Sequence, residues 1–284
     1  MSETREPSPP VTPPTDSGPE PEGPALAEGF YDEPTLYDVL HSAGTADEVR
    51  GLLRVCERLG LDSRGPWLEP ACGSGRYVRA AIARGVRIAG FDAEPAMIDY
   101  ATDRLRGVEP SLYRLGVATM EGFDADELAR GWRFALAFNP INTIRHLESD
   151  DDLLNHLRRV HDALQPGGVY AVGLSLSVYG AEQPSEDVWE GARGSLGVRQ
   201  VVQFIPPEER GDRFEQVHNV LHVTRPGGTQ TIPSAYRLRT YDRGEWEGVI
   251  ERSPFTLLGC VDEEGDPMEQ PMLGYAIWLL QREG

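Results

Sequence analysis

The most constraining feature of this 284-residue chain is a glycine-containing turn between a predicted strand and a predicted helix, Trp67-Leu68-Glu69-Pro70-Ala71-Cys72-Gly73-Ser74-Gly75-Arg76. Gly73 and Gly75 can adopt positive φ angles and have no side chain, so a ligand can lie against the backbone. The next predicted strand ends at Asp92, about 20 residues further on, where a carboxylate can accept hydrogen bonds from both hydroxyls of a ribose. The pattern predicts an adenosine-type ligand at the switch point of a doubly wound sheet.

Predicted strands and helices alternate around this turn. The strands are 66–69, 86–91, 111–118, 132–138 and 169–176, and the helices are 76–84, 95–106 and 150–164. Such alternation favours right-handed βαβ units and a parallel sheet covered on both faces. We therefore predict an α/β fold with a doubly wound, mostly parallel, Rossmann-like sheet of seven strands.

The pattern changes after residue 177. Three predicted strands at 198–205, 213–224 and 229–241 precede a helix at 242–252 and two closing strands at 255–261 and 274–280. In the third, apolar and charged residues alternate, as in a sheet with one face in water. We expect an antiparallel insertion between strand 5 and the last helix. It would cover the active site or, because its edges need protection, form a homodimer interface.

These patterns divide the chain into four segments. Residues 1–28 are rich in proline and are predicted to be a disordered tail. Residues 29–177 are the expected cofactor-binding core, 178–240 the insertion, and 241–284 the closing helix and strands. Within the core, we expect a helix over 45–60, with Thr45 and Glu48 as a capping box.

Composition limits the possible partners. The chain has 27 Lys and Arg against 46 Asp and Glu, a net charge of −19 that disfavours nucleic acid and anionic membrane surfaces. All its cationic residues are arginine, which excludes Schiff-base chemistry on lysine. Three scattered cysteines and no export signal indicate the cytoplasm. No run of residues has the length and apolarity of a membrane helix.

Two residues distinguish between possible cofactors. A dinucleotide site requires a third small residue where this chain has Val78. Glu69, at the tip of the first strand, would repel a pyrophosphate but suits an ammonium group. Together they argue against a nicotinamide-dependent oxidoreductase and favour a cofactor that is cationic at sulfur and nitrogen and carries no phosphate.

At this point residues 31–177 resemble a class I S-adenosylmethionine-dependent methyltransferase. The resemblance lies in the turn 69–75, in Asp92, in the helix sequence 94–101 and in the Leu-Gln-Pro-Gly-Gly turn 164–168. It is closest to small-molecule methyltransferases with an antiparallel insertion after strand five. The resemblance implies S-adenosylmethionine as cofactor, S-adenosylhomocysteine as product, and a small-molecule acceptor methylated on nitrogen or oxygen.

The resemblance also implies roles for individual residues. Those expected around the methionine moiety are Glu69, Ala71, Gly73 and Gly75. Asp92 would hold the ribose, and the residues near adenine would be Ala93, Met97, Thr119 and Met120. Many relatives have Asp where this chain has Thr119, so that contact with adenine departs from the pattern. Asn139 would lie near the methyl group, and Tyr31 and Tyr37 would belong to a lid over the cofactor.

The acceptor side offers fewer signals. His146, seven residues after the fourth strand, is the candidate general base because its ordinary pKa suits the task. His218 and His222, with Glu215 nearby, lack a third well-spaced ligand, and we expect no metal. The sequence Asn139-Pro140-Ile141-Asn142 partly matches enzymes that methylate nucleic-acid bases, which remain an alternative. A non-catalytic cofactor-binding protein on the same fold is the other alternative.

Overall fold

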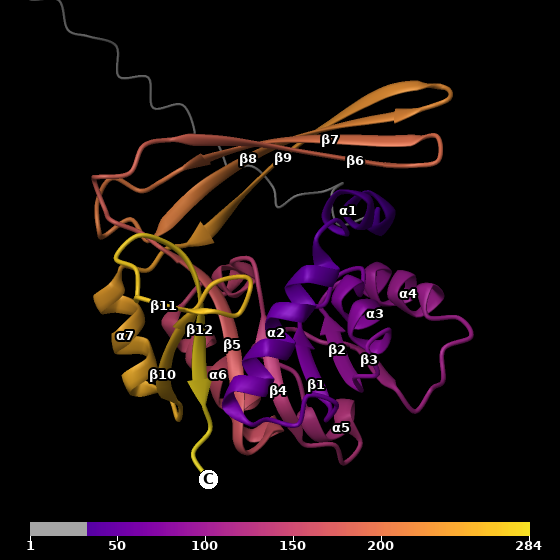
Figure 1. Cartoon of the computed structure of the whole chain (residues 1–284). Coiled ribbons are helices and arrows are strands. Elements are labelled where there is room, and N and C mark those ends of the chain that lie inside the picture. Colours follow the sequence, from indigo (N-terminus) through magenta and orange to yellow (C-terminus); the bar gives the residue numbers. More distant parts are fainter. Residues whose placement is uncertain (1–32) are drawn as a thin grey trace, which may run out of the picture.

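The computed structural model describes residues 33–284, which form two sheets and their covering helices (Figure 1). The predicted tail 1–28 and Tyr31 lie outside the described residues. The larger sheet has the strand order β11-β10-β12-β5-β4-β1-β2-β3. Its strands are β1 (Trp67–Pro70), β2 (Ile88–Asp92), β3 (Tyr113–Val117), β4 (Phe134–Asn139), β5 (Leu164–Leu176), β10 (Thr256–Val261), β11 (Pro267–Met268) and β12 (Gly274–Gln281).

Strands β1 to β5 of this sheet are parallel, and β12 runs antiparallel to both β5 and β10. The prediction of a doubly wound, mostly parallel sheet is confirmed, and the two-residue strand β11 is added at the edge of the seven. The chain moves outward from β1 through β2 to β3 and then returns to place β4 on the other side of β1. Such a reversal leaves a crevice at the carboxyl ends of the strands, where ligands bind.

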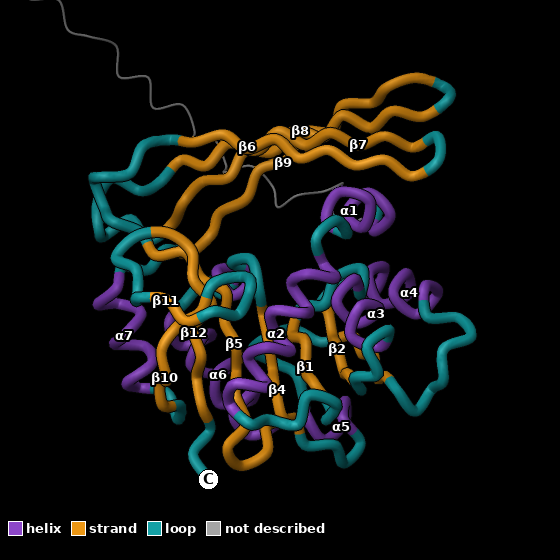
Figure 2. The backbone as a smooth tube through the Cα atoms, in the orientation of Figure 1, coloured by secondary structure: helices purple, strands orange, loops and turns teal. Residues whose placement is uncertain are grey.

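Helices cover both faces of the core sheet (Figure 2). The helices of the described residues are α1 (Pro34–His41), α2 (Thr45–Leu59), α3 (Arg76–Ile82), α4 (Pro95–Arg104), α5 (Ala125–Ala129), the 3-10 helix η1 (Thr143–His146), α6 (Asp150–Ala163) and α7 (Arg243–Arg252). The capping box at the start of α2 was wrong. Gly44 is the N-cap, and Thr45 and Glu48 instead accept hydrogen bonds from the buried Arg76 guanidinium, at 2.6 and 2.9 Å.

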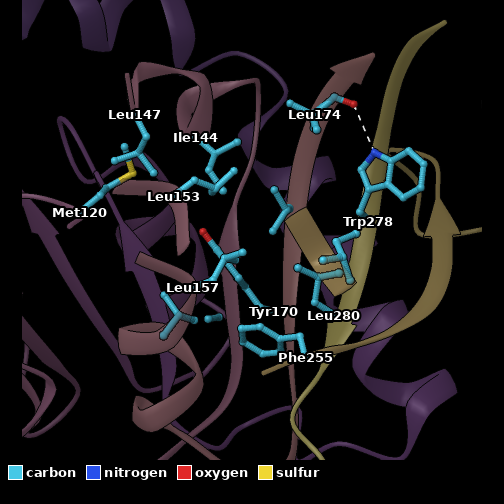
Figure 3. Close-up of a cluster of buried hydrophobic side chains, with 14 of the residues drawn as sticks. Met120, Ile144, Leu147, Leu153, Leu157, Tyr170, Leu174, Phe255, Trp278 and Leu280 are labelled. Carbon is cyan, nitrogen blue, oxygen red and sulfur yellow. Dashed lines mark hydrogen bonds between the residues drawn. The ribbon is translucent and has the colours of Figure 1, made fainter. Parts of the chain in front are cut away.

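Side chains of the core strands alternate between two buried apolar clusters. In β5, Tyr170 and Val172 join the cluster with α6 and α7, whereas Val169 and Ala171 join the cluster with α2 and α3. Figure 3 shows the first cluster, with Trp278 of β12 donating a hydrogen bond to the Leu174 carbonyl at 3.4 Å. This two-sided burial is the pattern expected of a parallel sheet with helices on both faces.

The smaller sheet is antiparallel, with the order β6-β7-β8-β9, and lies across the end of the core sheet toward which β1 to β5 run (Figure 1). Its strands are β6 (Ser185–Arg193), β7 (Leu196–Ile205), β8 (Phe214–Arg225) and β9 (Gly228–Arg239). The predicted insertion between strand five and the last helix is therefore present. The prediction missed β6, because this edge strand is exposed along almost its whole length and has no apolar alternation.

Helix α1 fills part of the space between the two sheets. Leu36, Val39 and Leu40 of α1 form a buried cluster with side chains of β7 and β8. At Gly191 of β6, an added Cβ would lie 2.3 Å from the Val39 carbonyl oxygen, so this strand can approach the helix only with glycine there. The insertion sheet is thus packed on α1 rather than directly on the core helices.

Candidate functional site

A cavity of about 430 Å³ opens at the carboxyl ends of the first strands of the core sheet. Its walls come from α1, the turn after β1, the end of β2, the loop after β3, and η1. The predicted site residues that line it are Tyr37, Ala71, Gly73, Asp92, Ala93, Met97, Thr119, Met120 and His146. Glu94, Ala118, Glu121, Thr143 and Leu147 complete the lining.

The glycine turn has the backbone that its sequence predicts. Ala71, Gly73 and Gly75 have φ angles of 52, 51 and 68°, in the left-handed region. At Gly75 an added Cβ would lie 2.9 Å from the Cβ of Ala101, so the absence of a side chain lets α3 begin close against α4. At Gly73 an added Cβ would lie 3.4 Å from the Tyr37 ring, which closes the turn from the side of α1.

Asp92 links the end of β2 to this turn. Its Oδ2 accepts a hydrogen bond from the Gly73 N–H at 2.7 Å, and its Oδ1 accepts one from the Glu94 N–H at 3.0 Å. Burial raises the pKa of this carboxyl, although the backbone donors act in the opposite direction. Asp92 is therefore held in one orientation at the wall of the cavity, with lone pairs left for a ligand's hydroxyl groups.

Glu69 and Asn139 do not line the cavity but lie buried at the ends of the adjacent strands β1 and β4. Glu69 is 2% exposed and Asn139 is fully buried. Asn139 Nδ2 donates to the Pro70 carbonyl at 2.9 Å, whereas Asn139 Oδ1 and Glu69 Oε2 have no hydrogen-bond partner in the described structure. Desolvation raises the pKa of Glu69 well above its usual range, against the opposing charge of Arg76. Two unsatisfied buried oxygens at the ends of neighbouring strands favour a cationic ligand group.

Asp38 of α1 is a buried carboxylate that the sequence analysis missed. Its Oδ1 accepts hydrogen bonds from Ser74 at 3.0 Å and from Arg79, and its Oδ2 accepts from Tyr100 at 2.8 Å and Arg193 at 2.6 Å. Although burial opposes ionisation, these donors hold the pKa of Asp38 well below its usual range. Asp38 thus joins α1 to the glycine turn, to α4 and to β6 of the insertion sheet.

His146 lies where η1 meets the insertion sheet. Its ring stacks on Tyr236 of β9, with centroids 5.7 Å apart, and the exposed His146 side chain is part of the cavity lining. The surrounding protein, and secondarily the Arg145 charge, lower its pKa to about 4. His146 was selected because an ordinary histidine pKa suits a general base, and its pKa here lies below that value. His146 is neutral at pH 7, where it can accept a proton only weakly.

The preceding residue, Arg145, fixes η1 to the insertion sheet. Its Nη2 donates to Glu215 Oε2 at 2.8 Å, and the two side chains are only 5% and 13% exposed. Its Nε also donates to the Arg239 carbonyl, at 2.8 Å. Glu215, which the sequence placed near His218 and His222 as a possible metal ligand, therefore forms an ion pair with Arg145. Among residues 33–284, no three His, Cys, Asp or Glu side chains are grouped as metal ligands would be.

Three aromatic residues in and beside the insertion sheet do not line the cavity. Phe204 packs in the insertion sheet's own apolar cluster, and Trp189 is 39% exposed on β6. The Tyr179 hydroxyl donates to Glu245 Oε2 at 2.7 Å, at the base of the insertion. His156, which the sequence gave no reason to select, hydrogen-bonds through Nδ1 to the Met120 carbonyl at 2.9 Å and so supports the cavity wall from behind.

Comparisons with known proteins agree with this architecture. Residues 68–168 match the family described as "Methyltransferase domain". The chain is 22% identical over 208 residues to the putative methyltransferase YqeM of Bacillus subtilis (strain 168), over 68% of this chain and 78% of the relative. No helix in the described part of the chain is long and apolar enough to span a membrane.

Two solved structures share the fold over most of their length. An S-adenosylmethionine-dependent methyltransferase from Clostridium acetobutylicum has a TM-score of 0.69 and 16% identity, covering 88% of this chain and 97% of that one. The sugar N-methyltransferase KedS8 from Streptoalloteichus sp. has a TM-score of 0.63 and 19% identity, covering 94% and 98%. The likeness to KedS8 includes the insertion, because the alignment spans almost the whole of both chains.

Proposed function

We propose that this chain, a class I methyltransferase in which residues 68–168 match a methyltransferase domain, transfers a methyl group from S-adenosylmethionine to a nitrogen or oxygen of a small molecule. The class I identity expected from the sequence is confirmed by the family match and by the shared fold. The observation that carries the cofactor assignment is the pair of buried, unpaired oxygens on Glu69 and Asn139, whose strands end next to Ala71 and Met120 of the cavity wall.

The residues present fit this cofactor. Its ammonium and sulfonium groups are cations, and Glu69 Oε2 and Asn139 Oδ1 are buried oxygens that lack a donor. Asp92 would bind the ribose hydroxyls, and Met97 and Met120 offer apolar contact to adenine at the cavity wall. Thr119, also at the wall, can offer one hydroxyl where an aspartate would offer a carboxylate.

Bound S-adenosylmethionine would supply an electrophilic methyl group on a positively charged sulfur. The protein's task is then to align the acceptor with that methyl group and to keep water out. We propose that Tyr37, His146 and the insertion sheet enclose the acceptor. The methylated amine nitrogen must lose a proton, and neutral His146 at the cavity wall would relay that proton to solvent.

A small acceptor is favoured by the position of the insertion sheet across the carboxyl ends of the core strands. A net charge of −19 provides little attraction for a nucleic-acid backbone. KedS8, a sugar N-methyltransferase, shares the fold over 94% of this chain. We propose a neutral or cationic small molecule as the acceptor class.

The proposal can be tested with S-adenosylmethionine that carries a tritiated methyl group, offered with a panel of small amines and alcohols. We expect tritium in the acceptor and an equal amount of S-adenosylhomocysteine. Glu69→Gln removes a carboxyl group that would ionise beside the cofactor ammonium and should raise the KM for S-adenosylmethionine at least tenfold, since a charge-assisted hydrogen bond contributes about 1.5–3 kcal/mol. Asp99→Asn, at an exposed aspartate of α4, is the matched control. Equal KM values in the two variants would contradict the role of Glu69.

A further inference from the structure

Three polar residues, Gln200, Asn219 and Ser234, lie among apolar residues on the face of the insertion sheet that is directed toward the core. Strand register sets the order of three successive rows across β7, β8 and β9: Phe204–Val217–Tyr236, then Val202–Asn219–Ser234, then Gln200–Leu221–Ile232. Successive rows are separated by about 7 Å, two residues along a strand. Asn219 of β8 and Gln200 of β7 are therefore diagonal neighbours, one strand and one row apart, in the middle of a face that is otherwise largely apolar.

Both amides are buried and incompletely hydrogen-bonded. Gln200 is 2% exposed and Asn219 is 1% exposed. Asn219 Nδ2 donates to Ser234 Oγ at 3.0 Å, but Asn219 Oδ1 and Gln200 Oε1 have no partner in the described structure. Turning the Asn219 amide over would pair its oxygen with Ser234 and leave the nitrogen unpaired instead. A buried polar atom without a hydrogen-bond partner destabilises the fold, so the presence of these two oxygens requires an explanation.

The position of the two amides relative to the cavity explains why their oxygens are unpaired. Tyr236, one row away from Asn219, stacks on His146 at the cavity. In the row of Gln200, Leu221 and Ile232 pack in the cluster with Tyr37 of α1, which also lines the cavity. The two amides thus lie between the two aromatic residues that join the insertion sheet to the cofactor cavity.

We propose that Asn219 and Gln200 bind the methyl acceptor through hydroxyl or amine groups remote from the methylated atom. A hydroxyl group suits both amides because it donates and accepts hydrogen bonds. The two amide oxygens are now shielded from water and have no hydrogen-bond partner among the described residues. When the acceptor binds, its hydroxyl groups would form hydrogen bonds with them. This inference rests on the proposed function, and it narrows the acceptor to a molecule with several polar groups, such as a polyhydroxylated amine.

Such a pair would set specificity as well as affinity. A site built to hydrogen-bond a substrate hydroxyl rejects analogues that lack it, because its own buried polar groups are then left unpaired. An amine on a plain hydrocarbon ring should therefore bind much more weakly than one on a hydroxylated ring. Replacing the amides with apolar side chains should remove this difference and leave cofactor binding unchanged.

The test uses calorimetric titration of the full chain saturated with S-adenosylhomocysteine. The probes are D-glucosamine, which carries several hydroxyls, and cyclohexylamine, which carries none. We expect the wild type to prefer D-glucosamine, Asn219→Leu to weaken that affinity at least tenfold, and Gln200→Met to weaken it about fivefold. Cyclohexylamine affinity should be equal in all variants. Gln203→Met, which removes an exposed amide from the same strand, is the control and should behave as wild type.

Thermal unfolding without acceptor provides the second readout. If the amides are unpaired, their apolar replacements should unfold at the same or a higher temperature than the wild type. A Tm lowered by several degrees would show that the amides serve the fold, and would overturn the inference.

The binding results separate the two proposals. Normal S-adenosylhomocysteine affinity with unchanged D-glucosamine affinity in the variants, or no wild-type preference between the two amines, would overturn this inference alone. A wild type that does not bind S-adenosylhomocysteine would overturn the proposed function and this inference with it.

Discussion

The core sheet and the insertion sheet are stabilised in different ways. Both faces of the core sheet are covered, and its side chains alternate between two large apolar clusters. The insertion sheet has smaller apolar clusters on the face toward the core, and its edge strand β6 is exposed. Its attachment to the rest of the molecule depends on buried or half-buried ion pairs from Asp38, Arg145 and Asp150. The difference indicates a core stabilised by apolar burial and a cover whose position depends on charge.

Removing the Asp38 carboxylate should have the largest effect on that attachment. Asp38→Ala leaves Arg79 and Arg193 without their shared partner, and breaking a buried pair costs about 3–5 kcal/mol. Urea unfolding should show a loss of this size. Asp103→Ala, which breaks an exposed pair with Arg106, should cost less than about 1 kcal/mol. Similar losses of stability in the two variants would contradict the claim that the buried ion pairs of Asp38 contribute more than an exposed pair.

The Asp38 effect should also depend on pH in a defined direction. Because the folded pKa is lowered, the stabilisation is fully present above the unfolded value near pH 4 and is lost as the pH falls below it. The stability gap between wild type and Asp38→Asn should therefore stay constant from pH 8 to about pH 5 and narrow only below about pH 4. A gap that closes near neutral pH would be inconsistent with an ionised Asp38.

Breaking the Arg145–Glu215 pair should cause the second-largest loss of stability. Among the described residues, Glu215→Ala leaves the buried Arg145 guanidinium with only the Arg239 carbonyl as a hydrogen-bond partner, and it should cost about 3 kcal/mol by urea unfolding. The nearby Glu148–Arg237 pair joins the same two regions, with side chains 59% and 49% exposed. Glu148→Ala should therefore cost at most about 1 kcal/mol. A larger loss of stability in Glu148→Ala than in Glu215→Ala would show that the buried pair is not the main connection between the insertion sheet and the core.

A glycine pair tests the core side of the comparison. Gly75→Ala combines a positive φ with a Cβ 2.9 Å from Ala101, whereas Gly85→Ala has the positive φ but nothing within 4 Å. The φ strain alone costs about 1–2 kcal/mol. Differential scanning calorimetry should show this loss for Gly85→Ala and a larger one for Gly75→Ala. Equal losses would mean that the approach of α3 to α4 is not tight.

The smallest expected effect is a change in the protonation of His146 with pH. With a pKa of about 4, its imidazole should stay neutral from pH 8 to about pH 5 and gain a proton only below that range. An NMR titration of the ring protons, assigned by their loss in His146→Asn, would follow this directly. A titration step between pH 6 and 7 would show that its surroundings do not disfavour the charged form.

Most of the cofactor side could be predicted because its chemistry lies in two short segments. The turn at Gly73 and Gly75 follows its strand directly, and Asp92 ends the next strand, so local patterns indicate both. The capping rule for Thr45 and Glu48 failed because a distant residue, Arg76, contacts both side chains. A local motif cannot predict such competition.

The acceptor side could not be predicted in the same way. Asp38 contacts Arg193, 155 residues away, and no short pattern encodes that contact. Asn219 and Gln200 are ordinary polar residues in a strand until the register places them on the inner face. Tyr236 was recognised as part of an alternating strand, but its contact with His146 depends on how the insertion sheet lies over the core.

The most direct test of the account is calorimetric titration of the protein with S-adenosylmethionine and S-adenosylhomocysteine, with NADH as the control ligand. We predict micromolar binding of both sulfur compounds and at least a tenfold loss of affinity in Asp92→Ala, where two charge-assisted hydrogen bonds to ribose disappear. Asp99→Ala should bind as the wild type does. Tight binding of NADH, or sulfur-cofactor affinity that is absent or insensitive to Asp92, would contradict the central claim.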